Sequence, residues 1–214
     1  MAVIEDGTSA GQLLAVDNTM RAARISERPQ EALAWYSIGA RSGALTAAAA
    51  AGAVFSLRNS GTNLIIVRRV GVGFVCTTAF TAAQAMDFSL IVARAFTASD
   101  TGGTAITLTG NNAKHRTSLG TLTGGDLRIA TTAALTAGTK ALDGNTTGSL
   151  GFFVAGVGTS LPYAPGNLFS HDTGDYPIVL AANEGINIQN LTLMGAAGVG
   201  TLYVGLEFAE VTAY

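Results

Sequence analysis

The stretch Gly200-Thr201-Leu202-Tyr203-Val204-Gly205-Leu206-Glu207-Phe208-Ala209-Glu210, near the end of the chain, decides the fold class. Its positions alternate in character: Leu202, Val204, Leu206 and Phe208 fall on one face, and Tyr203, Gly205, Glu207 and Ala209 fall on the other. Successive side chains of a β-strand point to opposite faces of its sheet. The pattern therefore predicts a strand with one buried face and one less buried face.

Upstream of this stretch, short runs rich in Val, Ile, Leu, Phe and Thr are separated by clusters of Gly, Asn, Asp and Ser, which is typical of strands joined by turns. The expected strands cover residues 54–58, 64–77, 88–96, 104–109, 127–131, 150–154, 178–181, 186–194 and 201–210. Asn59-Ser60-Gly61 and Asn183-Glu184-Gly185 are among the expected turns, because their residues tolerate positive φ. The sequence does not decide whether residues 45–53 form a helix or a loop, because their alanine run favours a helix but lies among glycines.

This series of runs predicts an all-β fold, an antiparallel, jelly-roll-like β-sandwich over residues 35–214 with an extended N-terminal arm over residues 1–34. The arm is rich in charge, and its apolar side chains are too scattered for an amphipathic helix. An arm of this kind gains order by lying on a partner. Arg21, Arg24 and Arg28 would then pair with acidic groups beneath it.

Trp35 and Tyr36 form an aromatic pair where the arm meets the sandwich, and Trp35 is the only tryptophan in the chain. Such a pair can fill the end of the core. It can also anchor a neighbouring subunit, because buried Trp and Tyr often dominate interface energies. Both interpretations of Trp35 and Tyr36 stay open, and the second makes them candidate partner-binding residues.

The composition favours an assembly. Of the 214 residues, 48% are apolar and only 12% are charged, against about 25% charged in an average soluble domain. Mean hydropathy is +0.38. Apolar surface in excess of what one core needs is usually buried against other subunits, so we expect a homo-oligomer or a larger assembly.

Several classes of partner and compartment are disfavoured. The net charge of −2 provides no basic field for nucleic acid. Arg58, Arg68 and Arg69 interrupt the longest apolar stretches, so we expect no membrane partner. The acidic start of the chain lacks the basic region of a signal peptide, and the single cysteine, Cys76, cannot form an internal disulfide. We expect synthesis in a cytoplasm.

Two parts of the chain resemble a known class of proteins. Tyr176-Pro177-Ile178-Val179-Leu180, Asn183-Glu184-Gly185-Ile186 and the 200–210 stretch resemble the closing strands of tailed-bacteriophage virion proteins with jelly-roll domains. Residues 6–21 of the arm resemble the N-terminal segments of phage structural proteins. The resemblance implies a virion component, first a capsid decoration or cement protein that binds the major capsid protein as a homotrimer. A collar protein, a head-fibre base and a tail accessory protein are the alternatives, and no catalytic residue carries over.

Three motifs resemble those of enzymes, and each fits a loop better. Gly7-Thr8-Ser9-Ala10-Gly11 matches a nucleophile elbow but has no strand before it. Asp100-Thr101-Gly102 and Asp172-Thr173-Gly174 are similar to the paired acids of aspartic proteases, yet Asp and Gly in this spacing also form turns. Side chains of the consecutive Ser170-His171-Asp172 cannot converge as a triad. We predict no catalytic residue, and a hydrolase that uses Asp100 and Asp172 is the third hypothesis.

We expect no cofactor and no metal ion. Asp143 with Asn145, or Asp172 with Asp175, could supply oxygen ligands to calcium, but no loop has the dense spacing of a calcium site. The basic cluster Lys114-His115-Arg116 is interpreted as a solvated loop or as a contact with an acidic neighbour. The second functional hypothesis is a carbohydrate-binding module, against which the aromatic content of 7% counts.

Overall fold

The computed structural model describes residues 32–46, 52–154, 166–171, 176–192, 195 and 197–214. The chain divides into two units, Met1–Gln30 and Glu31–Tyr214, and all of the described residues belong to the second unit. Its described residues contain strands and turns but no helix, which confirms the predicted all-β class. The arm residues Arg21, Arg24 and Arg28 lie outside the described residues.

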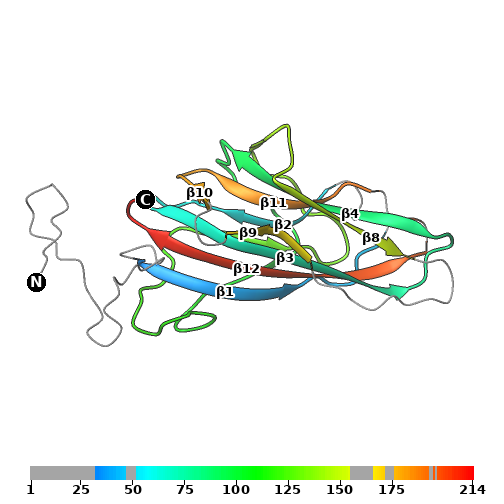
Figure 1. Cartoon of the computed structure of the whole chain (residues 1–214), viewed down its shortest axis with the longest axis horizontal. Coiled ribbons are helices and arrows are strands. Elements are labelled where there is room, and N and C mark those ends of the chain that lie inside the picture. Colours follow the sequence, from blue (N-terminus) through cyan, green and yellow to red (C-terminus); the bar gives the residue numbers. More distant parts are fainter. Residues whose placement is uncertain (1–31, 47–51, 155–165, 172–175, 193–194, 196) are drawn as a thin grey trace, which may run out of the picture. The chain divides into compact units, whose positions relative to one another are not determined.

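The described residues form twelve strands in two antiparallel sheets (Figure 1). The strands are β1 (Ala34–Arg41), β2 (Ala53–Arg58), β3 (Leu64–Thr78), β4 (Gln84–Arg94), β5 (Thr104–Ala105), β6 (Asp126–Ile129), β7 (Ala141–Leu142), β8 (Gly148–Val154), β9 (Gly166–Ser170), β10 (Ile178–Leu180), β11 (Gly185–Asn190) and β12 (Val199–Val211). The first sheet has the order β1-β12-β3-β10, and β9 also pairs with β3. The second has the order β5-β6-β2-β11-β4-β7, and β8 also pairs with β4.

The strand pairs are nested along the chain. β1 pairs with β12, β2 with β11, β3 with β9 and β10, and β4 with β8, all in antiparallel register. The strands β1 to β4 also alternate between the two sheets. The chain is thus paired as a long hairpin would be, and the hairpin is rolled so that its successive pairs lie in opposite layers.

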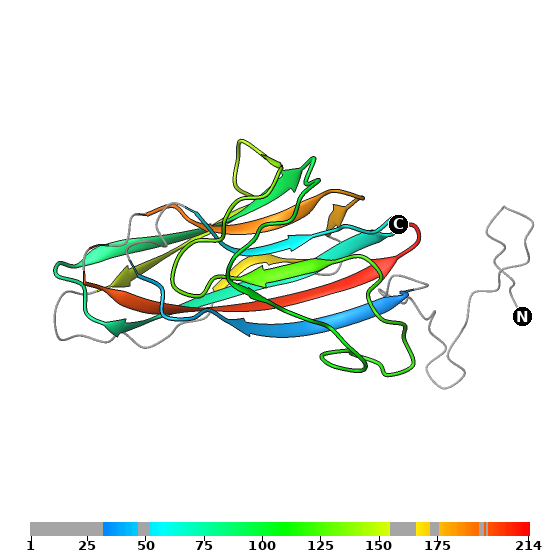
Figure 2. The same cartoon turned by 180° about the vertical axis from the view of Figure 1, so that it is seen from behind.

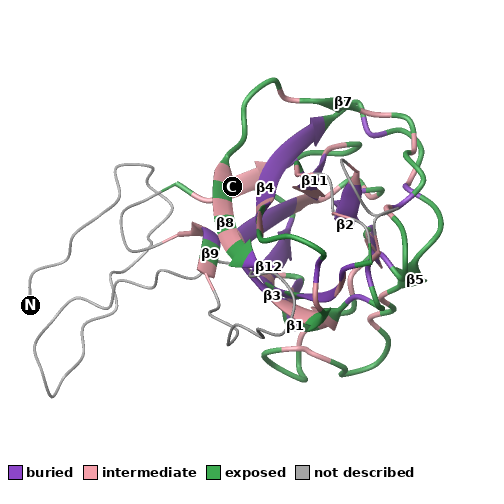
Figure 3. Cartoon of the chain, turned by 90° about the vertical axis from the view of Figure 1, so that its right-hand side faces the viewer, coloured by how far each residue is buried: buried purple, intermediate pink, exposed green. Residues whose placement is uncertain are grey.

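The two sheets enclose one hydrophobic core. On β12, Leu202, Val204, Leu206 and Phe208 are all at most 2% exposed and face the second sheet, so the predicted buried face is confirmed. On the opposite face Tyr203 and Gly205 are exposed as expected, whereas Ala209 is fully buried. Figure 3 shows that the buried residues lie on the strands and that the exposed residues lie mostly on the loops around them. Each large apolar side chain buried in this way contributes about 1.5–3 kcal/mol, and the predicted β-sandwich rests on this layer.

A long insertion between β4 and β8, residues 95–147, covers one side of the sandwich. Its strand β6 pairs with β2 and extends the second sheet. The same insertion reaches the edge of the first sheet, where the Ser37 N–H donates to the Ala113 carbonyl and the His115 N–H donates to the Trp35 carbonyl, each at 3.0 Å. Figure 2 shows this green segment crossing between the sheets. The insertion therefore covers the beginning of the β1 edge and pairs the edge of β2.

Several strand expectations differ from the structure. β1 and β9 were not expected, because Ser37 and Gly39 dilute the apolar pattern of β1 and β9 is only five residues long. Both strands pair with longer neighbours, β12 and β3, which supply the register that their own sequences lack. Within the open segment 45–53, Leu45 forms an isolated bridge with Gly200, and residues 47–51 lie outside the described residues.

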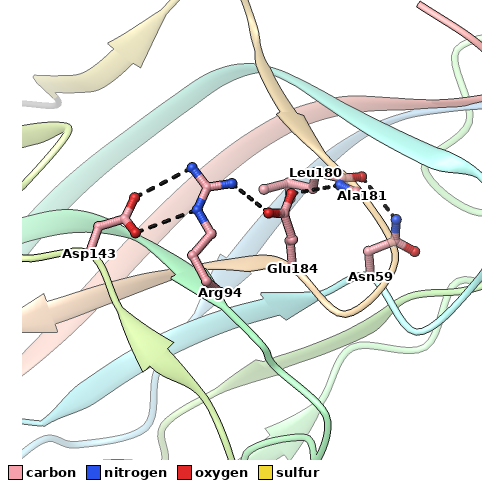
Figure 4. Close-up of polar contacts among 6 residues, drawn as sticks. All are labelled: Asn59, Arg94, Asp143, Leu180, Ala181 and Glu184. Carbon is pink, nitrogen blue, oxygen red and sulfur yellow. Dashed lines mark hydrogen bonds and ion pairs between the residues drawn. The ribbon is translucent and has the colours of Figure 1, made fainter.

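One end of the sandwich is held by an ion-pair chain at the predicted turns (Figure 4). Asn183 has a φ of 59°, as its place in the predicted turn requires. The next residue, Glu184, binds the Arg94 guanidinium at 2.6 Å, and Arg94 also contacts Asp143 at 3.4 Å. The Ala181 N–H donates to Glu184 Oε2 at 2.8 Å. Glu184 thereby ties the loop before β11 to Arg94, the last residue of β4, and Arg94 in turn contacts Asp143 near the end of the insertion.

Asn59 anchors a second predicted turn at the same end. Its side chain is buried, and its Nδ2 donates to the carbonyls of Asn63 at 2.7 Å and Leu180 at 3.0 Å. Its Oδ1 accepts from the Gly61 N–H at 3.0 Å, which closes the turn that Asn59-Ser60-Gly61 predicted.

Candidate functional site

The outer face of the first sheet carries a groove. In the register of β1, β12 and β3, Gly39, Gly205 and Gly71 lie side by side. Because glycine has no side chain, this row lowers the surface of the sheet, and Gly71 and Gly205 form the floor of the groove. The groove has a volume of about 380 Å³, and its polar lining comes from Ser37, Arg69, Asn167 and Glu207.

The walls of the groove hold their side chains in set positions. Arg69 Nε donates to Asn167 Oδ1 at 3.2 Å. Glu207 lies opposite Arg69 in the ladder and contacts Arg68 at 3.9 Å. One row beyond the glycine floor, Tyr203 is 37% exposed and lies under the Arg41 guanidinium, 5.9 Å from its ring centroid. The groove therefore offers hydrogen-bond donors and acceptors, and Tyr203 lies one row away on the same face.

Trp35 lies on this same outer face. The centroid of its half-buried ring lies 4.8 Å from the centroid of the His115 ring. The same ring centroid lies 5.5 Å from the guanidinium carbon of Arg68. Trp35 Nε1 donates to Glu207 Oε1 at 3.2 Å. The indole thus joins the wall of the groove to the insertion.

Tyr36 points the other way, as the next residue of a strand must. Its side chain is fully buried, stacks on Phe208 at 5.5 Å between centroids, and accepts a hydrogen bond from the Leu122 N–H at 3.0 Å. The structure therefore separates the predicted aromatic pair: Tyr36 packs in the core, and Trp35 remains at the surface where a partner could contact it.

Asp100, singled out in the sequence as one of two Asp-Thr-Gly acids, is 1% exposed. Its carboxylate accepts from the Gly138 N–H at 2.8 Å and from Asn187 Nδ2 at 3.0 Å, and it forms an ion pair with Lys140. Burial alone would raise the pKa of Asp100, but these hydrogen bonds together outweigh burial and lower the pKa of the carboxyl below its usual value. Its proposed protease partner, Asp172, lies outside the described residues.

A second buried carboxylate escaped the sequence analysis. Glu210, at the end of β12, is 1% exposed and accepts from the Thr123 N–H at 2.9 Å, from Asn63 Nδ2 at 2.8 Å and from the Thr123 hydroxyl. These contacts tie the insertion to the first sheet. No local signal marks this role, because Thr123 and Asn63 are far from Glu210 in the chain.

The predicted basic cluster is divided between two roles. Lys114 is half-buried, and its Nζ donates to the Leu119 carbonyl of the same loop at 3.0 Å, whereas the His115 ring packs against Trp35 at a tilt of 35°. In the part of the chain that the structure describes, no three His, Cys, Asp or Glu side chains are grouped to hold a metal ion, and no helix is suited to cross a membrane. Asp143 of one suggested calcium loop is paired with Arg94, and Asp172 and Asp175 of the other lie outside the described residues.

Comparisons of the chain with protein-family models, with curated proteins and with solved structures give no match.

Proposed function

We propose that the chain is a non-enzymatic structural protein of a tailed-bacteriophage virion. The observation that carries the proposal is the nested order of eight main strands, β1-β12-β3-β9 facing β2-β11-β4-β8, which is the order expected of a jelly roll. The C-terminal segments that resemble phage virion proteins fall on β10, β11 and β12, the closing strands of that order.

Within the virion, the proposed role is decoration of the capsid by a homotrimer that binds the major capsid protein. The sparse charge of the chain and the partly exposed Trp35 support a protein that buries surface against neighbours. Arg21, Arg24 and Arg28 would pair with acidic groups of the neighbour on which the arm lies. A collar protein, a head-fibre base or a tail accessory protein would use the same surfaces at another place in the particle.

The arrangement of Asp100 argues against the hydrolase hypothesis. Its carboxylate is buried and is engaged by Gly138, Lys140 and Asn187. A catalytic acid of a protease must touch its substrate, and this carboxylate faces the interior of the protein instead.

Light scattering on the full-length chain, followed by cosedimentation with phage heads that lack it, tests the proposal. We expect one species at three times the chain mass of 21.7 kDa and saturable binding to the heads. A triple variant, R21E/R24E/R28E, should keep the fold and lose head binding. A stable monomer that does not cosediment with heads would contradict the proposal.

A carbohydrate-binding module is the second candidate function, and the groove on the first sheet favours it. Hydroxyl groups of a sugar need both donors and acceptors, which Arg69, Asn167, Ser37 and Glu207 supply around the glycine floor. Tyr203 lies beside that floor and offers an aromatic face.

A further inference from the structure

Lys140, Asp100 and Asn187 form a closed polar cluster on the outer side of the second sheet, under the 95–147 insertion. The side chains of Lys140 and Asp100 are 5% and 0% exposed, and Asn187 is 0% exposed. Asn187 lies in β11, between Ile186 and Ile188, which face the core between the sheets. Its side chain therefore points away from that core and toward the insertion.

One carboxylate holds both of the other groups. Asp100 Oδ1 binds the Lys140 ammonium, and Asp100 Oδ2 accepts from Asn187 Nδ2 at 3.0 Å. The amine of a lysine and the carboxamide of an asparagine are thus each bound to one of the two oxygens of a single acid. The fully buried Phe96 ring covers the site, with its centroid 4.7 Å from Lys140 Nζ.

The Asn187 carboxamide is only half satisfied. Its Oδ1 is buried and has no hydrogen-bond partner among the described residues. An unpartnered buried acceptor is costly, so the Asn187 carbonyl oxygen is a strained part of the cluster that also holds the Lys140 amine.

We propose that Lys140 and Asn187 are joined by an intramolecular isopeptide bond, which the folded chain forms by itself with Asp100 as its catalytic acid and base. Asp100 first takes a proton from the Lys140 ammonium, a transfer that burial of the pair favours and that the hydrogen bonds from Gly138 and Asn187 to the carboxylate oppose. The freed Nζ attacks Asn187 Cγ, and the Nζ–Cγ bond forms. The Cγ–Nδ2 bond then breaks as Asp100 returns the proton to Nδ2. The second proton on the attacking Nζ passes through Asp100 to the departing ammonia, which leaves as an ammonium ion.

The reaction balances without a cofactor or an oxidant. A lysine ammonium and a carboxamide become a secondary amide, and one ammonium ion leaves for solvent. The protein ends lighter by one ammonia molecule. The new bond ties the 95–147 insertion covalently to β11, a central strand of the second sheet, and it would form whatever particle the chain belongs to.

Intact-mass spectrometry of the purified full-length chain tests the proposal. We expect the wild-type mass to fall short of the sequence mass by one ammonia, and we expect a tryptic peptide in which Lys140 is uncleaved and linked to Asn187. The variants K140R and D100N should each have their full sequence mass. The matched control is K114R, since Lys114 is also partly buried but its Nζ binds the Leu119 carbonyl; this variant should still lose ammonia.

Several outcomes would overturn the proposal. A wild-type chain at its full sequence mass excludes the bond. Loss of water instead of ammonia means that Asp100 itself is the acceptor. An ammonia loss that persists in K140R arises from cyclisation of an asparagine and not from a cross-link. The wild-type measurement decides the question even where a variant fails to fold.

Discussion

Trp35 Nε1 donates a hydrogen bond to Glu207 Oε1 at 3.2 Å, diagonally across the ladder between β1 and β12. This bond orients the indole on the outer face of the first sheet, between Arg68 and His115. It also holds Glu207 at the rim of the groove. One contact thus links the residue proposed to meet a neighbouring subunit with the groove proposed for a polar ligand.

The variant Trp35→Ala separates a role in assembly from a role in folding. The variant loses a cation–π contact worth about 0.5–1 kcal/mol and the hydrogen bond to Glu207, worth about 0.5–1.5 kcal/mol, so the monomer should be less stable by about 1–2.5 kcal/mol. An aromatic anchor in an interface contributes about 2 kcal/mol or more, so the oligomer should dissociate at markedly higher protein concentrations than the wild type. Light scattering over a dilution series measures the second effect and urea unfolding the first.

Tyr214→Ala is the control for Trp35→Ala, because Tyr214 is also an exposed aromatic residue but lies at the C-terminus. It should leave the oligomer unchanged. If Trp35→Ala and wild type dissociate at the same concentration, Trp35 is not an interface anchor.

The groove predicts a second variant, Gly205→Val. A Cβ at Gly205 would meet no heavy atom within 4 Å in the described part of the structure, and β-branched residues suit strands. The variant should therefore fold at least as stably as the wild type while its side chain fills the groove floor. A glycan array and titration calorimetry with the sugars that bind wild type measure the loss of binding.

Gly151→Val is the matched control for the groove. Gly151 is also an exposed strand glycine, in β8 of the second sheet, and a Cβ there would meet only the Met86 carbonyl oxygen at 4.0 Å. This variant should bind sugars as the wild type does. If Gly205→Val binds sugars as strongly as the wild type does, the sugar site does not lie in the groove.

Glu210 predicts a stability effect. Glu210→Ala removes the acceptor of the Thr123 N–H and of Asn63 Nδ2, and each buried donor left without a partner costs about 1–3 kcal/mol. Glu210→Gln keeps one oxygen and should cost less. Urea unfolding of the two variants gives the order, and equal midpoints for Glu210→Ala and wild type would show that this cluster does not stabilise the fold.

The sequence predicted the fold class well, because strong alternation on one long strand needs no tertiary information. Leu202, Leu206 and Phe208 are buried as their spacing indicates. It missed β1, whose outward positions Ser37 and Gly39 carry little apolar signal and whose register comes from β12.

The sites were harder to predict than the fold. Arg69, Asn167 and Glu207 meet only because three strands have a particular register, which no local pattern encodes. The same holds for Lys140 and Asn187 around Asp100. For Asp100, the turn chemistry of Asp-Thr-Gly was visible in the sequence, but its buried partners were not, since they come from distant segments. Trp35 and Tyr36 were recognisable as aromatic residues, and their opposite directions followed once β1 was placed.

The glycines of β12 provide the last prediction, because two of them have opposite surroundings on one strand. A Cβ at Gly200 would lie 2.0 Å from the Phe74 ring, whereas a Cβ at Gly205 would meet nothing within 4 Å among the described residues. Gly200→Ala should therefore destabilise the fold by about 1–3 kcal/mol through overpacking, and Gly205→Ala should stabilise it by a few tenths to about 1 kcal/mol, since glycine weakens a strand. Urea midpoints of the two variants should fall on opposite sides of the wild-type midpoint. If Gly200→Ala is as stable as Gly205→Ala, then Phe74 is not packed against the backbone of β12 as described.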